Sequence, residues 1–276
     1  MKAALLQLNV SDDPAINLLQ TVALIAHAAA QGAGFVLTPE VTNCVSMDRI
    51  HQQRVLQHEA DDQTLIGLRA AAKAHNIWLS IGSLALKTDD PDGRFANRSF
   101  VINPAGDIVA RYDKIHMFDV TVSETETYKE SAGYRPGTQA VVVPTPFGVL
   151  GLSICYDLRF PYLYRALAQG GAEILLVPSA FSPLTGAAHW ESLLRARAIE
   201  TGSYVLAAAQ TGEHAAFTGR VRQTYGHSLA VSPWGEVLAD SGTAPGITMV
   251  DIDRAVVAQS RKRITTLSPD RIFEGP

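Results

Sequence analysis

Gly32-Ala33-Gly34-Phe35-Val36-Leu37-Thr38-Pro39 consists of a glycine-rich turn, a short apolar run and a proline. The same pattern returns about half a chain length later, as Gly171-Ala172-Glu173-Ile174-Leu175-Leu176-Val177-Pro178. A short apolar run bounded by glycine and proline is typical of a buried strand. The sequence therefore predicts the same kind of strand twice.

A second pair of matching stretches follows in the same order. Residues 99–110 read Ser-Phe-Val-Ile-Asn-Pro-Ala-Gly-Asp-Ile-Val-Ala, and residues 228–239 read Ser-Leu-Ala-Val-Ser-Pro-Trp-Gly-Glu-Val-Leu-Ala. A Pro-x-Gly turn followed by an acidic residue, between two β-type runs, indicates a hairpin. Two hairpins with similar turns can also look alike without any duplication. Matches in the same order in two segments favour duplication.

The elements around these stretches alternate between strand and helix. Asp12-Asp13-Pro14 offers an acidic N-cap and a proline at the first helical position, which predicts a helix over residues 15–30 ending near Gly32. A second helix is expected over 61–75, and strands over 3–8 and 77–82. We therefore expect an α/β fold, a four-layer αββα sandwich with an internal pseudo-two-fold, formed by residues 1–276 as a single domain.

Composition excludes several classes of protein. The 276 residues carry 23 basic and 27 acidic side chains, and the densest basic cluster is Arg261, Lys262 and Arg263. With this near-equal number of charges and no long basic run, the sequence gives no basic patch that would bind a polyanion. Nucleic acid is therefore not an expected partner. No apolar run reaches 18 residues, and residues 1–10 do not resemble a cleaved leader. We expect a cytoplasmic protein that does not enter a membrane.

The sequence favours neither a metal nor a bound cofactor. It has two cysteines and no CxxC, and its eight histidines show no HxH or HExxH spacing. The phosphate-loop, dinucleotide-binding and GxSxG motifs are absent. Since one disulfide at most is possible and none is needed at this size, a cysteine is available for catalysis.

Cys155 follows an apolar strand and precedes Pro161, which can begin a helix. Backbone N–H groups at such a junction lower the pKa of a thiol and can bind an oxyanion. A free cysteine can equally be a small buried core residue. Cys44 also lies among polar neighbours, so composition does not rank the two cysteines.

Glu40 and Lys114 are candidates on similar grounds. Glu40 ends the run 35–37, where ligands of α/β folds commonly bind, and burial there would raise its pKa towards that of a general base. Lys114 follows the second strand of the first hairpin and could act as an electrophilic cation. Taken alone, each could also be an ordinary solvated side chain.

Together these residues occupy three segments that resemble a known family. Thr38-Pro39-Glu40, the segment 112–119 (YDKIHMFD) and the segment 154–161 (ICYDLRFP) are similar to the three signature segments of the nitrilase superfamily of carbon–nitrogen hydrolases. The resemblance extends over nearly the whole chain, through residues 187–190, 195–201, 225–228 and 233–235. It implies an αββα sandwich and a homodimer or larger homo-oligomer.

The resemblance also implies a role for each residue. Cys155 becomes the nucleophile, Glu40 the general base, and Lys114, with the backbone N–H of Tyr156, the group that stabilises the oxyanion. Glu130 matches a second glutamate that supports the lysine.

The implied function is an amidase that hydrolyses a small ω-amido acid to a carboxylate and ammonia through a cysteine thioester. The segments resemble the branch containing deaminated-glutathione amidase and ω-amidase, whose substrates are ω-amides of α-keto dicarboxylates. N-carbamoyl amino acids or nitriles are alternative substrates.

The resemblance also implies a cation that binds the substrate carboxylate. The candidates are Arg159, Arg197, Arg220 and Arg222, of which Arg159 is the first choice. Arg195 and Arg197 are better explained by an ion pair or an interface.

Two positions depart from the family pattern. The loop 120–127 lacks a Pro-Gly turn, and Tyr162 stands where relatives usually carry an acid. Both are expected to border the substrate pocket.

Two other classes of function stay open. A cysteine–histidine hydrolase would use His116, His189 or His227 as its base. A non-catalytic binding protein would use the pocket without any nucleophile.

Overall fold

The computed structural model describes residues 1–124, 126–217, 219–268 and 270–275. Its first sheet has seven strands. Along the sheet these are β17 (Gly246–Asp251), β1 (Lys2–Gln7), β2 (Phe35–Leu37), β3 (Trp78–Leu86), β4 (Phe95–Ile102) and β5 (Ile108–Asp113), with β8 (Tyr134–Arg135) also paired to β4. Strands β1, β2 and β3 are parallel, and β17, β4 and β5 extend the sheet with antiparallel pairs.

The second sheet repeats this plan. Its order is β16 (Val237–Asp240), β15 (Leu229–Val231), β12 (Tyr204–Ala207), β11 (Ile174–Leu176), β10 (Gly148–Leu152) and β9 (Val142–Thr145). Strands β10, β11 and β12 are parallel, and an antiparallel strand or hairpin again lies on each side of them. The duplicated stretches of sequence occupy matching positions, β2 with β11 and the β4–β5 hairpin with the β15–β16 hairpin.

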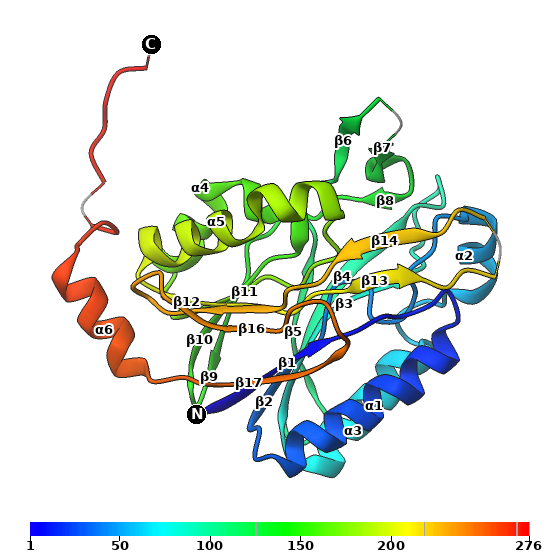
Figure 1. Cartoon of the computed structure of the whole chain (residues 1–276), viewed down its shortest axis with the longest axis horizontal. Helices are drawn as coiled ribbons and strands as arrows, with labels where there is room; N and C mark the ends of the chain where they lie inside the picture. Colours follow the sequence, from blue (N-terminus) through cyan, green and yellow to red (C-terminus); the bar gives the residue numbers. More distant parts are fainter. Residues whose placement is uncertain (125, 218, 269, 276) are drawn as a thin grey trace.

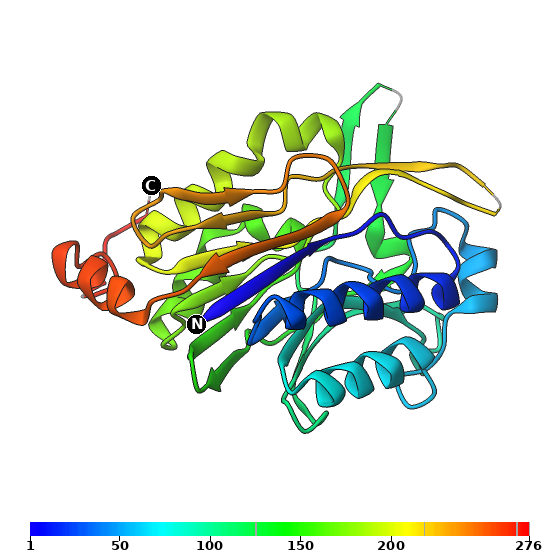
Figure 2. The same ribbon diagram turned by 60° about the horizontal axis from the view of Figure 1, so that its bottom comes forward.

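The two sheets pack on each other, and helices cover the outer face of each (Figures 1 and 2). Helices α1 (Pro14–Ala30) and α3 (Gln63–His75) contact the first sheet, and α4 (Pro161–Gln169) and α5 (Pro183–Thr201) contact the second. The predicted α/β sandwich of the type αββα is confirmed.

Strand β1 explains why the strands read as continuous apolar runs. Ala3 and Leu5 belong to the core cluster shared with the second sheet, whereas Ala4 and Leu6 belong to the cluster under the helices. Because both faces of the strand are buried, no polar alternation is needed.

The helix boundaries follow the predicted signals. The Asp13 side chain accepts hydrogen bonds from the backbone N–H groups of Ala15 and Ile16 at the start of α1, and Gly32 adopts a φ of +88° just beyond its end. Asp62 caps α3 in the same way. The helix α2 (Arg49–Val55) is not among the predicted elements, and β3 extends four residues beyond the end of the predicted strand 77–82.

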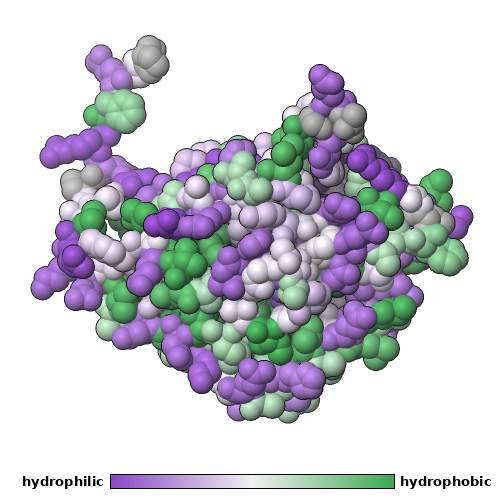
Figure 3. Space-filling view, viewed as in Figure 1, coloured by the Kyte–Doolittle hydropathy of each residue, from purple (hydrophilic) through white to green (hydrophobic). Residues whose placement is uncertain are grey.

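The segment predicted as a loop at 120–127 is mostly a β-hairpin, β6 (Asp119–Ser123) and β7 (Glu126–Lys129), although Thr125 lies outside the described residues. Strands β6 and β7 stand out from the body of the molecule (Figures 1 and 3). A second hairpin, β13 (Thr211–His214) and β14 (Arg222–Tyr225), joins neither large sheet. The remaining elements are α6 (Arg254–Arg263) and the 3₁₀ turns η1 (Glu130–Ala132) and η2 (Cys155–Arg159).

Among the described residues, no helix has the length and apolar character needed to span a bilayer.

Candidate active site

A cavity of about 310 Å³ lies where the loops after β2, β5 and β10 meet. Glu40, Lys114, Glu130, Cys155 and Tyr156 all line it. The structure therefore brings together the five residues that the sequence assigned to the reacting centre and its support, although they are up to 116 positions apart (156 − 40).

Cys155 sits at the start of η2, directly after the strand β10 and the short link that follows it. Its backbone has a φ of +50°, a conformation that non-glycine residues rarely adopt, and its N–H donates to the carbonyl oxygen of Pro178 at 2.9 Å. Such strain is found mainly where the surrounding structure holds a functional side chain in place. The predicted strand-to-helix junction is correct, with a 3₁₀ turn between β10 and the helix that Pro161 begins.

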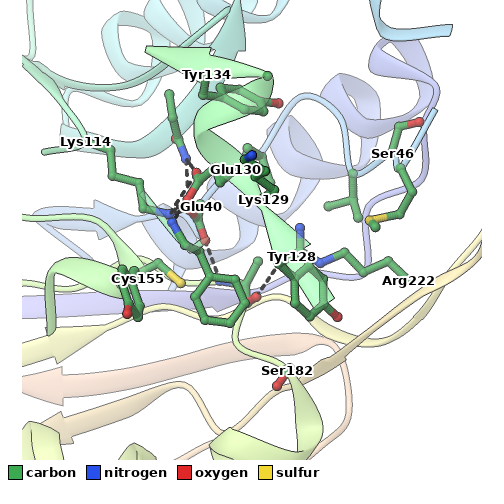
Figure 4. A pocket seen from close by; sticks show the side chains of 18 of the residues that line it. Glu40, Ser46, Lys114, Tyr128, Lys129, Glu130, Tyr134, Cys155, Ser182 and Arg222 are labelled. Atoms are coloured by element: carbon green, nitrogen blue, oxygen red, sulfur yellow. Dashed lines mark hydrogen bonds and ion pairs between the residues drawn. The ribbon is translucent and has the colours of Figure 1, made fainter. Parts of the chain in front are cut away.

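Lys114 bridges two carboxylates (Figure 4). Its Nζ lies 2.8 Å from Glu40 Oε1 and 3.0 and 2.9 Å from the two carboxylate oxygens of Glu130. The lysine side chain is only 2% exposed. The ammonium is thus buried and held by an ion pair on each side.

The two glutamates are fixed by further donors. Glu40 Oε2 accepts from the backbone N–H of Ala180 at 2.9 Å, and Glu130 Oε2 accepts from the backbone N–H of Phe118 at 2.6 Å. The side-chain amide of Asn97 donates to Glu40 Oε1 at 2.9 Å and to Glu130 Oε1 at 3.4 Å. Both carboxylates are therefore oriented before any substrate binds.

Electrostatics correct two predictions about pKa values. Burial is the largest single influence and raises the pKa of Glu40. The charge and hydrogen bond of Lys114, with smaller contributions from Arg222 and Cys155, together outweigh burial, so the net pKa is below the ordinary value of 4.5. The pKa of the Cys155 thiol is raised, mainly by burial and then by the Glu40 charge, rather than lowered. The pKa of Lys114 is also raised, because the charges of Glu130 and Glu40 overcome its burial. The resting site thus holds a carboxylate, an ammonium and a neutral thiol.

Of the four arginine candidates for carboxylate binding, Arg222 lines the cavity and the other three do not. Arg159 does not line the cavity; its guanidinium lies over the rings of Tyr156 and Phe181. Arg197 is buried and donates to the carbonyl oxygen of Leu158. Arg220 is exposed and does not line the cavity, whereas Arg222 does.

The ion pairs expected of the two helix arginines are present. Arg195 pairs with Glu191 at 3.2 Å and Arg197 with Glu200 at 2.9 Å. A role in an interface stays a prediction.

The histidine candidates lie outside the cavity. His116 stacks on Phe160 and contacts the Asp157 carboxylate at 2.7 Å, and His227 contacts Asp240 at 3.0 Å. His189 is exposed and contacts Arg159. None of the three lines the cavity, so the geometry gives a histidine base no support.

Of the two departures from the family pattern, the segment 120–127 borders the cavity as expected and Tyr162 does not. The β6–β7 hairpin supplies Thr127, Tyr128 and Lys129 to the cavity wall, so this segment does border the pocket. Tyr162 does not line the cavity; it is 63% exposed and its hydroxyl contacts His116.

Asn97 and the backbone N–H of Ala180 are parts of the site that the sequence patterns do not predict. Asn97 is a buried amide in the largely buried strand β4, and a buried polar side chain is itself a signal of a specific partner. The role of Ala180 depends on its backbone, which no residue type reveals. In the described parts of the chain, no three histidine, cysteine or acidic side chains are grouped to hold a metal ion.

Comparisons with known proteins agree with this geometry. Residues 2–262 match the family model described as carbon-nitrogen hydrolase. A relative from Yersinia enterocolitica, named deaminated glutathione amidase, is 38% identical over 97% of this chain and 92% of its own length.

Two solved structures extend the comparison. The NitFhit protein of C. elegans superposes with a TM-score of 0.89 at 36% identity, covering 98% of this chain and 65% of that chain. This chain thus spans about two thirds of NitFhit. A mutant of the amidase from Nesterenkonia sp. is 27% identical, with a TM-score of 0.77 over 96% of this chain and 98% of that one, and is described as showing Michael addition of acrylamide at the active-site cysteine. The chain therefore belongs to the carbon-nitrogen hydrolase family of the nitrilase superfamily, and it is a hydrolase of bonds between carbon and nitrogen.

Proposed function

We propose that this protein is an amidase in which Cys155 is the nucleophile, Glu40 the general base and Lys114 the oxyanion-stabilising cation. The observation that supports this most directly is the contact of one buried ammonium with two carboxylates in the cavity that Cys155 lines. The cysteine adduct described for the Nesterenkonia amidase supports a cysteine nucleophile in a related protein.

The first step forms a covalent intermediate. Because the thiol pKa is raised and that of Glu40 is lowered, the thiol is neutral and must lose its proton as it attacks. Glu40 accepts this proton while Sγ bonds to the amide carbon, and the carbonyl electron pair moves onto oxygen. Lys114 and the backbone N–H of Tyr156 stabilise the oxyanion.

The second step breaks the carbon–nitrogen bond and then the thioester. The tetrahedral intermediate collapses, the nitrogen takes the proton from Glu40, and the amine or ammonia leaves. Glu40 then takes a proton from water as the water oxygen attacks the thioester carbon. The carbon–sulfur bond breaks, the acid is released and the thiol regains its proton.

For the substrate we propose an ω-amide of a short dicarboxylic acid, with deaminated glutathione as the first candidate, after the name of the Yersinia relative. In that compound the cleaved amide nitrogen belongs to cysteinylglycine, so the leaving group is a dipeptide amine. The expectation of ammonia holds only for a primary amide such as α-ketoglutaramate, which is the second candidate. Both share the acyl product 2-oxoglutarate, and N-carbamoyl amino acids and nitriles do not yield it.

The test is release of 2-oxoglutarate from each compound by the wild-type protein and its variants. Cys155→Ala and Glu40→Gln are expected to abolish turnover. Cys44→Ala is the matched control, since Cys44 is a buried free cysteine that also lines the cavity. Turnover that survives Cys155→Ala, or that is lost only when a histidine is replaced, would contradict the assignment.

We further propose that the protein acts in the cytoplasm as a homo-oligomer. Exposed apolar side chains on α5, Leu184 and Ile199, support a contact between copies. Light scattering of the purified protein, together with the Ile199→Glu variant, tests this. A monomeric wild type would contradict it.

A further inference from the structure

Arg222 lies across the cavity from the reacting groups. It comes from β14, and Figure 4 shows its side chain beside Tyr128, on the far side from Lys114 and Cys155. Its Nη2 donates to the carbonyl oxygen of Ala180 at 2.7 Å. The same residue, Ala180, donates its backbone N–H to Glu40. The guanidinium is therefore held at a fixed position relative to the general base.

The cavity carries more positive than negative charge. Its lining includes Arg49, Lys114, Lys129 and Arg222 as cations, against Glu40 and Glu130 as anions. An excess of two positive charges in a partly enclosed site favours an anionic ligand.

Two of these cations already have their partners. Lys114 is enclosed by the two glutamates. Arg49 donates to the carbonyl oxygens of Gly133 and Gly93, each at 2.8 Å, and its guanidinium covers the ring of Phe95.

Arg222 keeps most of its donors available. Within the described ranges it makes one hydrogen bond, to a backbone carbonyl, and no ion pair with an acidic side chain. Guanidinium offers five N–H donors in a planar fork suited to a carboxylate. Lys129 is an exposed side chain at the rim of the same cavity.

We propose that Arg222 binds the free carboxylate of an ω-amide substrate, with Lys129 adding positive charge at the rim, while the amide lies at Cys155. The assignment rests on the proposed function and names its substrate class: short ω-amides of dicarboxylic acids. It gives the role of carboxylate binding to Arg222 instead of Arg159, which does not line the cavity and whose guanidinium lies over the rings of Tyr156 and Phe181.

Binding of such a carboxylate has a consequence for the general base. The Arg222 charge contributes to lowering the pKa of Glu40. A carboxylate paired with Arg222 offsets that charge and moves the Glu40 pKa upwards, which makes Glu40 a stronger base.

A pair of amides isolates the carboxylate. Glutaramate, the monoamide of glutaric acid, and pentanamide share the amide and the five-carbon chain, and only glutaramate has a carboxylate. We expect Arg222→Ala to raise the KM of glutaramate about 10- to 100-fold, as for a lost hydrogen-bonded charge pair. The kcat/KM of pentanamide, which has no carboxylate to lose, should fall much less than that of glutaramate. Arg222→Lys should give a KM for glutaramate between those of the wild type and Arg222→Ala.

Arg220→Ala is the matched control, because Arg220 is a nearby exposed arginine that does not line the cavity. Equal loss of kcat with both amides would overturn the proposal, since Arg222 would then act only by positioning Ala180 and Glu40. Selective loss of glutaramate turnover in Arg159→Ala, and not in Arg222→Ala, would overturn it too.

Binding to the Cys155→Ala protein separates this proposal from the proposed function. Calorimetry should show that glutaramate binds more tightly than pentanamide, and that adding Arg222→Ala removes the difference. If this result is obtained while the wild type hydrolyses neither amide, the carboxylate site stands and the proposed function fails. If the wild type hydrolyses the amides but the two amides bind equally, the proposed function stands and the carboxylate site fails.

Discussion

The side-chain amide nitrogen of Asn97 donates to Glu40 Oε1, the same oxygen that Lys114 binds. The amide also reaches Glu130, so one NH₂ group lies between two carboxylates of like charge. Hydrogen bonds to a carboxylate stabilise its charged form. Asn97 therefore supports the ionised form of Glu40 alongside Lys114 and places a donor between Glu40 and Glu130.

Asn97→Ala should raise the pKa of Glu40 by about one unit, because it removes a hydrogen bond to a buried charge. In the wild type the acid limb of kcat/KM lies below pH 4.5, since the pKa of Glu40 is lowered and the base must be ionised. The variant's limb moves to higher pH. The measurement is the pH profile of kcat/KM, with circular dichroism to show that the fold persists.

Asn103→Ala is the control, in the turn that follows the same strand. An unchanged acid limb in Asn97→Ala, with activity reduced equally at every pH, would show that Asn97 only supports the strand.

Asp157→Asn should lower both stability and turnover. Its carboxylate is fully buried and accepts from the Tyr112 hydroxyl at 2.6 Å, from the Ile154 backbone N–H at 2.9 Å and from the backbone N–H and ring of His116. It thus ties the strand that leads to Lys114 to the turn that carries Cys155. In asparagine, an NH₂ group replaces one of the two accepting oxygens and faces one of these donors. The unpaired donors lower the free energy of unfolding by about 1–3 kcal/mol.

Chemical denaturation and kcat measure the two effects of Asp157→Asn. Asp240→Asn is the comparison, because Asp240 is an exposed partner of His227. Full activity in Asp157→Asn would contradict the role of this link.

The carboxyl ends of parallel strands could be predicted to carry the site, because Glu40 and Cys155 follow apolar runs that read as buried strands. The contact between Lys114 and Glu130 could be inferred only through the resemblance, since sequence spacing does not say how a hairpin folds back over a cavity. The pKa directions of Glu40 and Cys155 were predicted wrongly. For Glu40, burial was visible in the surrounding pattern, but the 2.8 Å distance from Lys114 was not. For Cys155, burial and the charge of Glu40 outweigh the groups that lower the pKa of the thiol.

The β6–β7 hairpin was missed for a related reason. Its residues 120–127 are mainly polar, and the strands pair with each other instead of joining a buried sheet. Without a buried face there is no strong apolar alternation to find.

Gly82→Ala should disrupt the contact between the two halves of the site. A Cβ at this position would overlap the carbonyl oxygens of Thr38 and Pro39 and would lie 2.5 Å from Cβ of Pro178. Pro39 precedes Glu40, and the Pro178 carbonyl holds the backbone of Cys155. Since backbone must move to relieve the overlap, we expect a loss of about 2–3 kcal/mol of stability and most of the activity.

Thermal unfolding and turnover test this substitution. Gly34→Ala is the matched control, because a Cβ there would have its nearest contact at 3.9 Å, to a flexible methionine. Wild-type stability in Gly82→Ala would show that the two halves are less tightly packed than the distances require.

Asp62→Asn should stabilise the protein at neutral pH. Burial raises the pKa of Asp62 to about 6, from an ordinary 3.8, despite its hydrogen bonds to the first turn of α3. Because the folded state binds the proton more tightly than the unfolded state, folding stability falls as the pH rises from about 4 to 6 and stays lower above that.

Asparagine at position 62 keeps the acceptor for the Leu65 N–H without the buried charge. We expect a gain of about 1–2 kcal/mol at pH 7, after the loss of the favourable interaction with the helix dipole, and no gain below pH 4. Urea unfolding at both pH values measures it, and a gain of equal size at both would contradict the titration of Asp62 as its cause.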